Sequence, residues 1–373
     1  MTAETDFAPW ETDQEPLIKI DQVSKRFGEF TAIDRISLNI YRQEFFALLG
    51  PSGCGKTTLM RMLAGFETPT EGLLSIDGLD MANVPPNKRA VNMMFQSYAL
   101  FPHLSVWDNI AFGLRRDKMP KDQVAARVEE MLKLVQLEKF AKRKPHQISG
   151  GQRQRVALAR SLAKAPKLLL LDEPLGALDK KLRQETQFEL MDIQEKTGTT
   201  FVIVTHDQEE AMTVASRVAV MDHGRIIQVE TPERIYEQPN SVYVADFIGD
   251  VNLFPGRVSA NGGESATLSW AEGKALIGQV GTGVSSGDEA TFAIRPEKIA
   301  ISRDEPEANN RVQGKILDIG YLGNLSTYHV ELPEGPVVKC EVGNRSRVAR
   351  RDFTWEEEVW LSWSDTAGLV LSK

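Results

Sequence analysis

The chain has 373 residues, 42% of them hydrophobic and 26% charged, with a formal net charge of −8. This length and balance predict a globular protein of about two domains. The negative charge argues against non-specific nucleic-acid binding, which needs a basic surface. The two cysteines, Cys54 and Cys340, lack the spacing of metal ligands and indicate a reducing compartment. No apolar run reaches the roughly 18 residues of a membrane span, so work at a membrane would depend on other chains.

The first segment of the chain is acidic. Residues 1–16 hold five carboxylates and neither Lys nor Arg, which predicts a solvated, flexible tail. After this tail, short apolar segments bounded by polar turns predict strands over 17–23, 32–40 and 45–49, and a hairpin over 72–80.

A glycine-rich turn follows the strand expected at 45–49 and precedes a helix. It matches G-x-x-x-x-G-K-[S/T], the phosphate-binding loop, whose glycines let backbone N–H groups point at phosphate oxygens. Lys56 would bridge the β- and γ-phosphates, and the Thr57 hydroxyl would bind Mg²⁺. The alternative is an ordinary turn between strand and helix. The residues expected around the phosphates are Gly50, Ser52, Gly53, Cys54, Gly55, Lys56, Thr57 and Thr58.

Cys54 lies within this loop, at the expected start of the helix. A helix N-terminus inside an anion site tends to lower the pKa of a thiol. We therefore expect maleimide to modify Cys54 and inactivate the protein, and MgATP to protect it. The alternative is that Cys54 is a small, inert filler residue.

The following part of the chain alternates helices and strands. Apolar runs predict buried strands over 91–95, 168–171 and 201–204, and a hairpin over 218–229. Between them, an apolar stripe with the spacing of one helix face is formed by Val124, Val128, Met131, Leu132 and Val135. The alternation predicts a mainly parallel sheet covered by helices.

Two acidic residues end the strand expected at 168–171. Asp172 stands where a Mg²⁺ ligand is expected, at the carboxyl end of a parallel strand beside the phosphate loop. Glu173 points in another direction and can accept a proton from an attacking water molecule. The alternative is a turn with two solvated acids.

The character of the chain changes after about residue 250. Glycines separate short strands, and no helical periodicity of useful length is present. Residues 251–373 therefore predict a small all-β domain, in the form of a partly closed barrel.

The segment Ser149-Gly150-Gly151-Gln152 resembles the signature motif of ATP-binding-cassette (ABC) ATPases. Further motifs of that family appear in order. Gln96 resembles the Q-loop glutamine, Ala177-Leu178-Asp179 resembles the D-loop, and His206 resembles the switch histidine. Phe27 stands where the family places an aromatic ring against adenine. Ser149 with two glycines at a helix N-terminus would form a second anion-binding end, suited to a γ-phosphate.

The resemblance implies a fold and a set of site residues. It covers residues 17–248 as an ABC cassette, with a helical subdomain over about 97–165 and an OB-like or TOBE-like β-domain at 251–373. The implied ligands are ATP and Mg²⁺. The implied catalytic residues are Gln96, Glu173 and His206, and the implied metal ligands are Thr57, Gln96 and Asp172. The further nucleotide contacts are Phe27, Ser149, Gly150, Gly151, Gln152 and Asp179.

Only one phosphate loop and one signature occur in the sequence. In the resembled family the signature cannot reach its own loop, so the resemblance implies a head-to-tail homodimer that encloses two ATP molecules. Residues 92–103 resemble the segment by which importers meet their membrane subunits, and residues 294–299 and 321–325 resemble a regulatory β-domain of importers. These features imply two transmembrane permease subunits, an extracytoplasmic solute-binding protein, and a peripheral place on the cytoplasmic face of the inner membrane.

The segments 142–147 and 176–181 most resemble polyamine importers, in particular those for putrescine. Importers of spermidine, iron, sulfate and sugars share most of these features and remain alternatives. A soluble ABC ATPase of DNA repair or translation is a second class, but the long insertion or the second cassette of those proteins is missing. A phosphate-loop kinase would lack the signature.

Overall fold

The computed structural model describes residues 10, 14–176, 178–344 and 352–372 of the chain. The chain forms two units, Met1–Pro232 and Glu233–Lys373. Most of the acidic tail expected over 1–16 lies outside the described residues.

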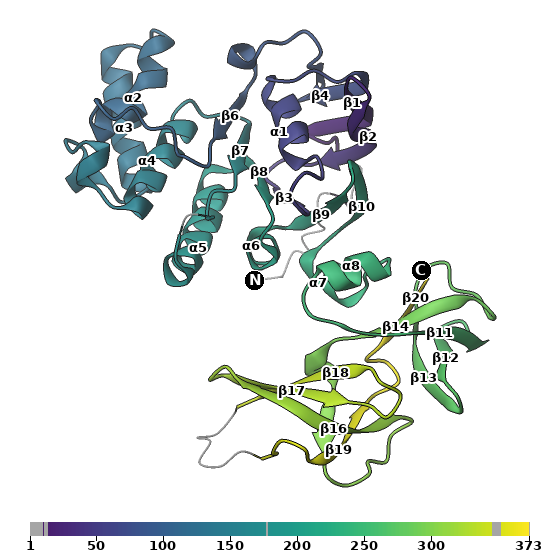
Figure 1. The fold of residues 1–373 in the computed structure, drawn as a ribbon. Coiled ribbons are helices and arrows are strands. Elements are labelled where there is room, and N and C mark those ends of the chain that lie inside the picture. The colour runs from purple at the N-terminus through teal and green to yellow at the C-terminus, as the bar shows by residue number, and fades with distance from the viewer. Residues whose placement is uncertain (1–9, 11–13, 177, 345–351, 373) are drawn as a thin grey trace, which may run out of the picture. The chain divides into compact units, whose positions relative to one another are not determined.

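A six-stranded sheet forms the centre of the first unit (Figure 1). Its strands are β3 (Phe45–Leu49), β6 (Val91–Met94), β7 (Leu168–Asp172), β8 (Thr200–Thr205), β9 (Arg217–Asp222) and β10 (Arg225–Glu230). Their order is β10-β9-β3-β8-β7-β6, and all neighbours pair in parallel except the edge strand β10. Every residue of β3 and β8 is buried, as expected for apolar strands covered on both faces. The predicted parallel sheet is confirmed.

A second, antiparallel sheet completes the strands of this unit. It contains β1 (Ile18–Phe27), β2 (Phe30–Ile40), β4 (Glu71–Ile76) and β5 (Leu79–Asp80), in the order β2-β1-β4-β5. The strands expected near the start of the chain are thereby confirmed. One cluster of buried side chains joins both sheets to the helix α1 (Lys56–Ala64), so the helix that follows the glycine-rich turn is held in the core.

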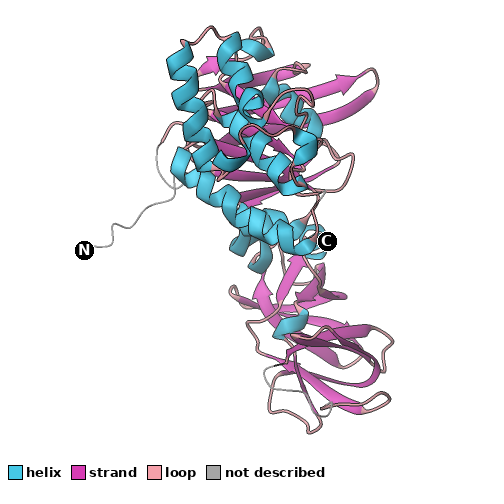
Figure 2. Cartoon of the chain, turned by 90° about the vertical axis from the view of Figure 1, so that its left-hand side faces the viewer, coloured by secondary structure: helices cyan, strands magenta, loops and turns pink. Residues whose placement is uncertain are grey.

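Five further α-helices lie in the described part of the first unit. They are α2 (Val106–Arg116), α3 (Lys121–Leu134), α4 (Gly150–Leu162), α5 (Lys180–Thr197) and α6 (Gln208–Val214). Figure 1 shows α2, α3 and α4 grouped together beside β6 and β7, and Figure 2 shows the helices in front of the strands when viewed from that side. The apolar stripe predicted for this block is buried, at Val124, Val128, Met131, Leu132 and Val135. A helical subdomain follows the strand β6, as expected.

The second unit holds two β structures rather than one. A closed barrel has the order β11-β12-β13-β20-β14, and a separate sheet has the order β15-β19-β16-β17-β18. The barrel strands are β11 (Asn252–Asn261), β12 (Ser265–Ala271), β13 (Lys274–Val280), β14 (Glu289–Ile294) and β20 (Leu369–Ser372). The sheet strands are β15 (Ala300–Ser302), β16 (Asn310–Tyr321), β17 (Leu325–Glu331), β18 (Val337–Gly343) and β19 (Glu358–Trp363).

The expected single, partly closed barrel is therefore corrected to a closed barrel with an additional sheet. Closure depends on β20, which pairs in parallel with β13 and antiparallel with β14. Such pairing between distant segments leaves no local signal in the sequence. The two structures share one core, in which the Trp363 ring lies 6.2 Å from that of Phe254 and 6.1 Å from that of Phe292, measured between centroids.

The second unit begins with two short helices, α7 (Pro232–Glu237) and α8 (Val242–Phe247). The division of the chain after Pro232 thus falls earlier than the boundary expected at residue 248. The buried guanidinium of Arg295 explains this division. It donates hydrogen bonds to the carbonyl oxygens of Tyr236, Ala245, Gly249 and Asp250, which join both helices to the end of β14.

Candidate nucleotide site

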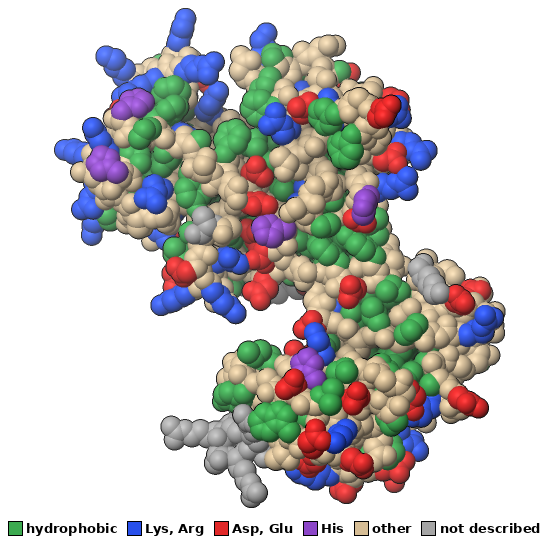
Figure 3. Space-filling model, in the orientation of Figure 1, with side chains coloured by type: hydrophobic (Ala, Val, Ile, Leu, Met, Phe, Trp, Pro, Cys, Tyr) green, Lys and Arg blue, Asp and Glu red, His purple; other side chains and the backbone are tan. Residues whose placement is uncertain are grey.

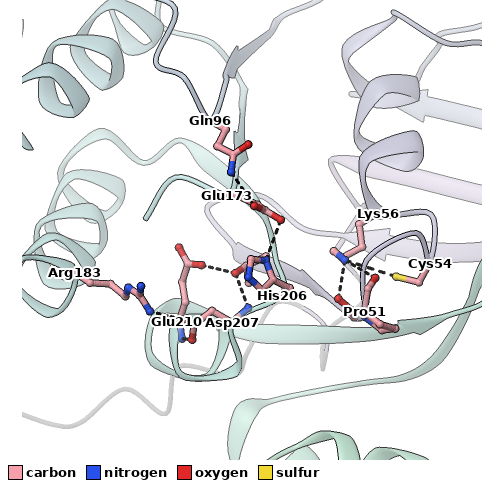
Figure 4. A network of polar contacts seen from close by, with 11 residues as sticks. Pro51, Cys54, Lys56, Gln96, Glu173, Arg183, His206, Asp207 and Glu210 are labelled. Atoms are coloured by element: carbon pink, nitrogen blue, oxygen red, sulfur yellow. Dashed lines mark hydrogen bonds and ion pairs between the residues drawn. The ribbon is translucent and has the colours of Figure 1, made fainter. Parts of the chain in front are cut away.

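The carboxyl ends of four parallel strands meet at one edge of the central sheet. Leu49 of β3 pairs with Thr205 of β8, and Asp172 of β7 pairs with Val204 of β8. Residues that directly follow these strands must therefore lie close together. This edge carries the glycine-rich turn, Glu173, His206 and, beyond β6, Gln96, and Figure 4 shows their side chains around one space.

Two glycines of the turn are required by close backbone contacts. A Cβ atom on Gly50 would lie 2.3 Å from the carbonyl oxygen of Met221. Gly55 has a φ of 107°, in the left-handed region, and a Cβ atom there would lie 2.6 Å from the carbonyl oxygen of Ala32. The helix α1 starts after Gly55 without a side-chain cap. The first N–H groups of α1 therefore have no side-chain cap and are available to phosphate oxygens.

Lys56 is the buried cation of this loop. Its Nζ donates to the carbonyl oxygens of Gly50, at 2.6 Å, and Pro51, at 2.9 Å. The ammonium group thus faces the inside of the turn (Figure 4). The side chain of Thr57 is exposed and that of Thr58 is half-buried, and Ser52 and Gly53 are exposed at the tip of the turn.

Cys54 does not have the environment expected from the sequence. The residue is only 4% exposed and belongs to the core cluster that joins the two sheets. Burial raises the pKa of the thiol above its ordinary value, and the neighbouring Lys56 opposes the rise only in part. The expected lowering of the Cys54 pKa is therefore wrong, because the sulfur atom lies in the core.

Glu173 stands at the centre of a polar cluster. Its Oε2 accepts a hydrogen bond from Nε2 of Gln96 at 3.0 Å, and its Oε1 lies 3.0 Å from Nδ1 of His206 (Figure 4). The backbone of Glu173 has a φ of 44°, in the left-handed region that non-glycine residues rarely adopt. Three segments far apart in the chain therefore converge on one carboxylate.

The neighbouring carboxyl group, Asp172, is partly buried. Burial raises the pKa of Asp172, the charge of Glu173 adds to the rise, and Lys56 opposes it. Figure 3 shows a run of acidic side chains around a histidine on this face of the first unit. Among the described residues, no group of three or more His, Cys, Asp or Glu forms a ready-made metal cluster.

The residues of the signature segment serve as a helix cap. Ser149 Oγ accepts from the backbone N–H of Gln152 at 3.2 Å, and Gln152 Oε1 accepts from the N–H of Ser149 at 3.0 Å. This reciprocal capping box fixes the start of α4, where Gly150 and Gly151 stand. Figure 1 shows α4 and α1 on opposite sides of β6 and β7, so a single chain does not bring the signature to the phosphate loop.

Two further expected residues lie at the ends of elements. Asp179 caps α5 by accepting from the N–H of Leu182 at 3.0 Å, while Ala177 lies outside the described residues. Phe27 ends β1 and is 46% exposed, and Nζ of Lys25 lies 4.8 Å from its ring centroid. The exposed ring is accessible to a flat ligand.

Sequence reasoning missed a buried group behind His206. Glu210, on α6, is 2% exposed, and Arg183 of α5 forms an ion pair with Asp207 next to it. The only signal in the sequence is the spacing of Asp207 and Glu210, which fits a helix cap. Burial of Glu210 could not be read from that spacing.

The fold and the site together define a phosphate-loop nucleotide-binding protein. Residues 33–176 match the family described as ABC transporter, and residues 292–371 match the TOBE domain. The putrescine transport ATP-binding protein PotG of Escherichia coli (strain K12) is 52% identical over 361 residues, covering 96% of this chain and 95% of the relative. The chain belongs to the ABC transporter ATPase family, with a C-terminal TOBE domain.

Other relatives agree with this assignment. The spermidine/putrescine import ATP-binding protein PotA of Chromobacterium violaceum is 46% identical, covering 96% of this chain and 99% of the relative. Among solved structures, cbiO1 from Clostridium perfringens, part of the ABC transporter complex cbiONQ, has a TM-score of 0.57 and 31% identity, over 60% of this chain and 91% of that one. The cassette MJ0796 bound to ADP and Pi, a dimer, has a TM-score of 0.51 and 33% identity, over 58% of this chain and 98% of that one. None of the described helices is both long and apolar enough to cross a membrane.

Proposed function

We propose that this chain is the ATP-hydrolysing subunit of an importer for polyamines, with putrescine as the main solute. The observation that carries the proposal is the 52% identity to a putrescine transport ATP-binding protein, which extends over 96% of the chain and so includes the TOBE domain. Identity to the spermidine/putrescine relative is lower, at 46% over a similar span. Importers of spermidine, iron, sulfate or sugars are the alternatives that the experiment below separates.

The proposal includes partners and a location. Two copies of the chain act together with two transmembrane permease subunits and an extracytoplasmic solute-binding protein, and the chain is peripheral on the cytoplasmic face of the inner membrane. The absence of a spanning helix from the described residues agrees with a peripheral place, so the permease subunits provide the path for the solute. Nucleic acid has no role in this function.

The phosphate loop binds the phosphates of ATP in this proposal. Lys56 exchanges its bonds to the carbonyl oxygens of Gly50 and Pro51 for bonds to the β- and γ-phosphates. The glycines keep side chains away from the phosphates, while the N-terminus of α1 supplies positive potential. Phe27 stacks on the adenine with its exposed ring.

The acidic character of the site favours a cation that accompanies ATP. Asp172 and Glu173 would repel the anionic phosphates, and burial, together with the charge of Glu173, raises the pKa of Asp172. The exposed hydroxyl of Thr57, together with Gln96 and Asp172, would hold Mg²⁺, directly or through water. Bound Mg²⁺ neutralises charge that develops on the phosphate oxygens.

Glu173 is the general base of hydrolysis in this proposal. Its carboxylate accepts the proton of the attacking water, while Gln96 and His206, each 3.0 Å away, hold it in position. His206 is 58% exposed at its side chain and can also donate to the γ-phosphate. Ser149, Gly150, Gly151, Gln152 and Asp179 of the second copy complete the site, because α4 of the same chain stands on the far side of β6 and β7.

Transport of labelled putrescine by the assembled importer tests the proposal. The complex is reconstituted in vesicles that hold the ATPase chain and an ATP-regenerating system inside. Unlabelled spermidine, iron, sulfate and maltose serve as competitors. We expect ATP-dependent uptake that unlabelled putrescine suppresses most strongly. The Glu173→Gln variant is the control for uptake that does not depend on hydrolysis. ATP-dependent uptake of another solute, without uptake of putrescine, would contradict the assignment of putrescine as the solute.

A cross-linking experiment tests the shared site separately. Ser52, exposed in the phosphate loop, and Ser149 are replaced by cysteine in a Cys340→Ser, Glu173→Gln chain, in which Cys54 stays buried. A short bis-maleimide is expected to give a covalent dimer in the presence of ATP, and each single replacement serves as the control. Cross-links that form equally without ATP, or only within one chain, would contradict the head-to-tail dimer.

A further inference from the structure

Glu210 is a buried carboxyl group behind the switch histidine. The residue is 2% exposed, and its Oε2 accepts a hydrogen bond from the hydroxyl of Thr205. Its Oε1 is buried and has no partner among the described residues. A buried carboxyl group with an unsatisfied oxygen lowers the stability of the fold. An apolar side chain would fill the same space at less cost, so packing alone does not account for Glu210.

The hydrogen bonds of Glu210 close the turn that carries His206. The hydroxyl of Thr205 donates to Glu210 and also accepts from the N–H of Asp207 at 3.0 Å. The Oδ1 of Asp207 accepts in turn from the N–H of Glu210 at 3.0 Å. The His206 side chain between these residues is more than half exposed, so its direction depends on the backbone of this turn.

Arg183 connects the same turn to the segment before α5. One guanidinium nitrogen, Nη1, forms an ion pair with Asp207, and Nη2 donates to the carbonyl oxygen of Leu178 at 3.3 Å. The remaining nitrogen, Nε, is buried without a partner among the described residues, as is Oε1 of Glu210. Figure 4 shows Arg183, Asp207 and Glu210 side by side. Arg183, a cationic donor, and Glu210, a carboxyl acceptor, therefore each have one buried polar atom without a hydrogen-bond partner in the described part of the chain. Both lie near His206, the residue that faces Glu173.

We propose that Glu210 is a positioning residue for ATP hydrolysis, which holds the Thr205–Asp207 turn so that His206 faces Glu173 and, with Arg183, ties this turn to the D-loop segment. The inference rests on the proposed function, since it assumes that His206 acts on ATP. Among the described residues, no hydrogen bond or ion pair joins Glu210 to Glu173 or to the phosphate loop, and Glu210 acts through the turn that carries His206.

The electrostatics around Glu210 guide the choice of variants. Burial raises the pKa of Glu210 to about 7, Asp207 and Glu173 add to the rise, and Thr205 and Arg183 oppose it. At neutral pH a large share of the molecules therefore carries a proton on this carboxyl. A glutamine is a close mimic of that neutral form, since it keeps the shape and an oxygen for the Thr205 hydroxyl.

Steady-state ATP hydrolysis by the full chain tests the proposal with three variants. Glu210→Ala is expected to lower kcat by about tenfold and to leave KM for ATP within about twofold, because the phosphate loop is untouched. Glu210→Gln is expected to restore kcat to within about threefold of the original value. Glu209→Ala, which removes the same charge from the exposed neighbour on α6, is the matched control and is expected to leave kcat within about twofold.

A double-mutant cycle with His206→Ala separates positioning from a general loss of stability. If Glu210 acts through His206, Glu210→Ala has no further effect on kcat in the His206→Ala background. Equal, additive losses in the two backgrounds overturn the proposal, as does a kcat of Glu210→Ala close to that of the original chain. A normal kcat for His206→Ala would instead refute the role of His206 in the proposed function.

Thr205→Val keeps the proposal testable if Glu210→Ala does not fold. This substitution removes the hydroxyl that bonds both Glu210 and the N–H of Asp207 while it keeps the shape of the side chain. A lowered kcat with an unchanged KM is expected. A folded Thr205→Val chain with undiminished kcat would also overturn the proposal.

Discussion

The Oε1 atom of Glu173 lies 3.0 Å from Nδ1 of His206, although 33 residues separate them in the chain. The pairing of β7 and β8 produces this contact, because Asp172 and Val204 stand side by side in the sheet just before the two residues. The distance fits one hydrogen bond, so the imidazole fixes one oxygen of the carboxylate while Gln96 fixes the other. A water molecule that approaches Glu173 therefore meets a carboxylate with a fixed direction.

Replacement of Glu173 by glutamine is expected to leave ATP binding intact and to lower hydrolysis by about 10²–10⁴-fold, because only the proton acceptor changes. The variant keeps an oxygen for His206 and occupies the same volume. Nucleotide binding by calorimetry and steady-state turnover check the two parts. Lys56→Ala, the contrasting variant, is expected to weaken binding itself. Turnover of Glu173→Gln within tenfold of the original chain would exclude the role of general base.

The two cysteines are expected to resist maleimide in the native protein, at rates at least about tenfold below that of an exposed thiol. Cys54 is 4% exposed and Cys340 is 0% exposed, and burial raises the pKa of both thiols, that of Cys340 to about 12. Mass spectrometry over time, with and without guanidinium, measures the labelling. Rapid labelling of Cys54 in the native protein, prevented by MgATP, would contradict this prediction and support the reactive thiol expected from the sequence.

The contribution of Glu210 to the stability of the first unit is expected to become unfavourable as the pH rises from about 4.5 to about 7. The pKa of Glu210 is raised from its ordinary value of 4.5 to about 7, so in this interval the folded chain holds a proton that the unfolded chain releases. The full loss, present above about pH 7, is about 3 kcal/mol on the scale of 1.36 kcal/mol per pKa unit. The melting temperature of the Glu210→Gln variant should exceed that of the original chain at pH 8.

The same comparison at lower pH provides the control. Below the ordinary carboxyl pKa both states of the original chain are protonated at Glu210, so the difference between the two chains should shrink toward pH 5. A constant difference in melting temperature across the whole pH range would mean that the pKa of Glu210 is the same in the folded and unfolded states.

A fragment of residues 1–232 is expected to fold and to bind ATP with the affinity of the whole chain. All expected nucleotide contacts lie before its end, and α7 and α8 belong to the second unit. A fragment of residues 1–249 would keep these helices but lack Arg295. In the whole chain, Arg295 donates hydrogen bonds to four carbonyl oxygens in these helices and in the residues that follow α8. Analytical sedimentation and calorimetric titration compare the fragments. A folded 1–249 fragment beside an unfolded 1–232 fragment would contradict this division.

The sequence predicted those features that depend on local pattern. The phosphate loop is recognisable because its glycines, Lys56 and Thr57 are contiguous, and the apolar runs of β7 and β8 predicted the centre of a parallel sheet. The resemblance to ABC ATPases implied Gln96, Glu173 and His206 as one catalytic set, and the carboxyl ends of parallel strands bring them to one edge of the sheet. Their contacts in the structure agree with that expectation.

Features that depend on tertiary packing could not be predicted. Cys54 occupies a loop position that suggests exposure to anions, but its sulfur atom packs into the core. Glu210 has the sequence context of an ordinary cap residue, and only the fold shows that it is buried. The pairing of β20 with β13 and β14, which closes the barrel, joins segments far apart in the chain and leaves no local pattern to predict it.

The closure of the barrel determines the order in which the second unit can be completed. β14 and β20 are neighbours through the pairing of Thr291 with Leu371, yet all five strands of the other sheet lie between them in sequence. During synthesis β13 and β14 therefore wait with open edges until the chain up to β20 has emerged from the ribosome, because loop closure over this distance cannot occur earlier. A nonsense or frameshift mutation anywhere between β14 and β20 would leave both edges exposed, and its product would be prone to aggregation even though the complete ATPase unit precedes it.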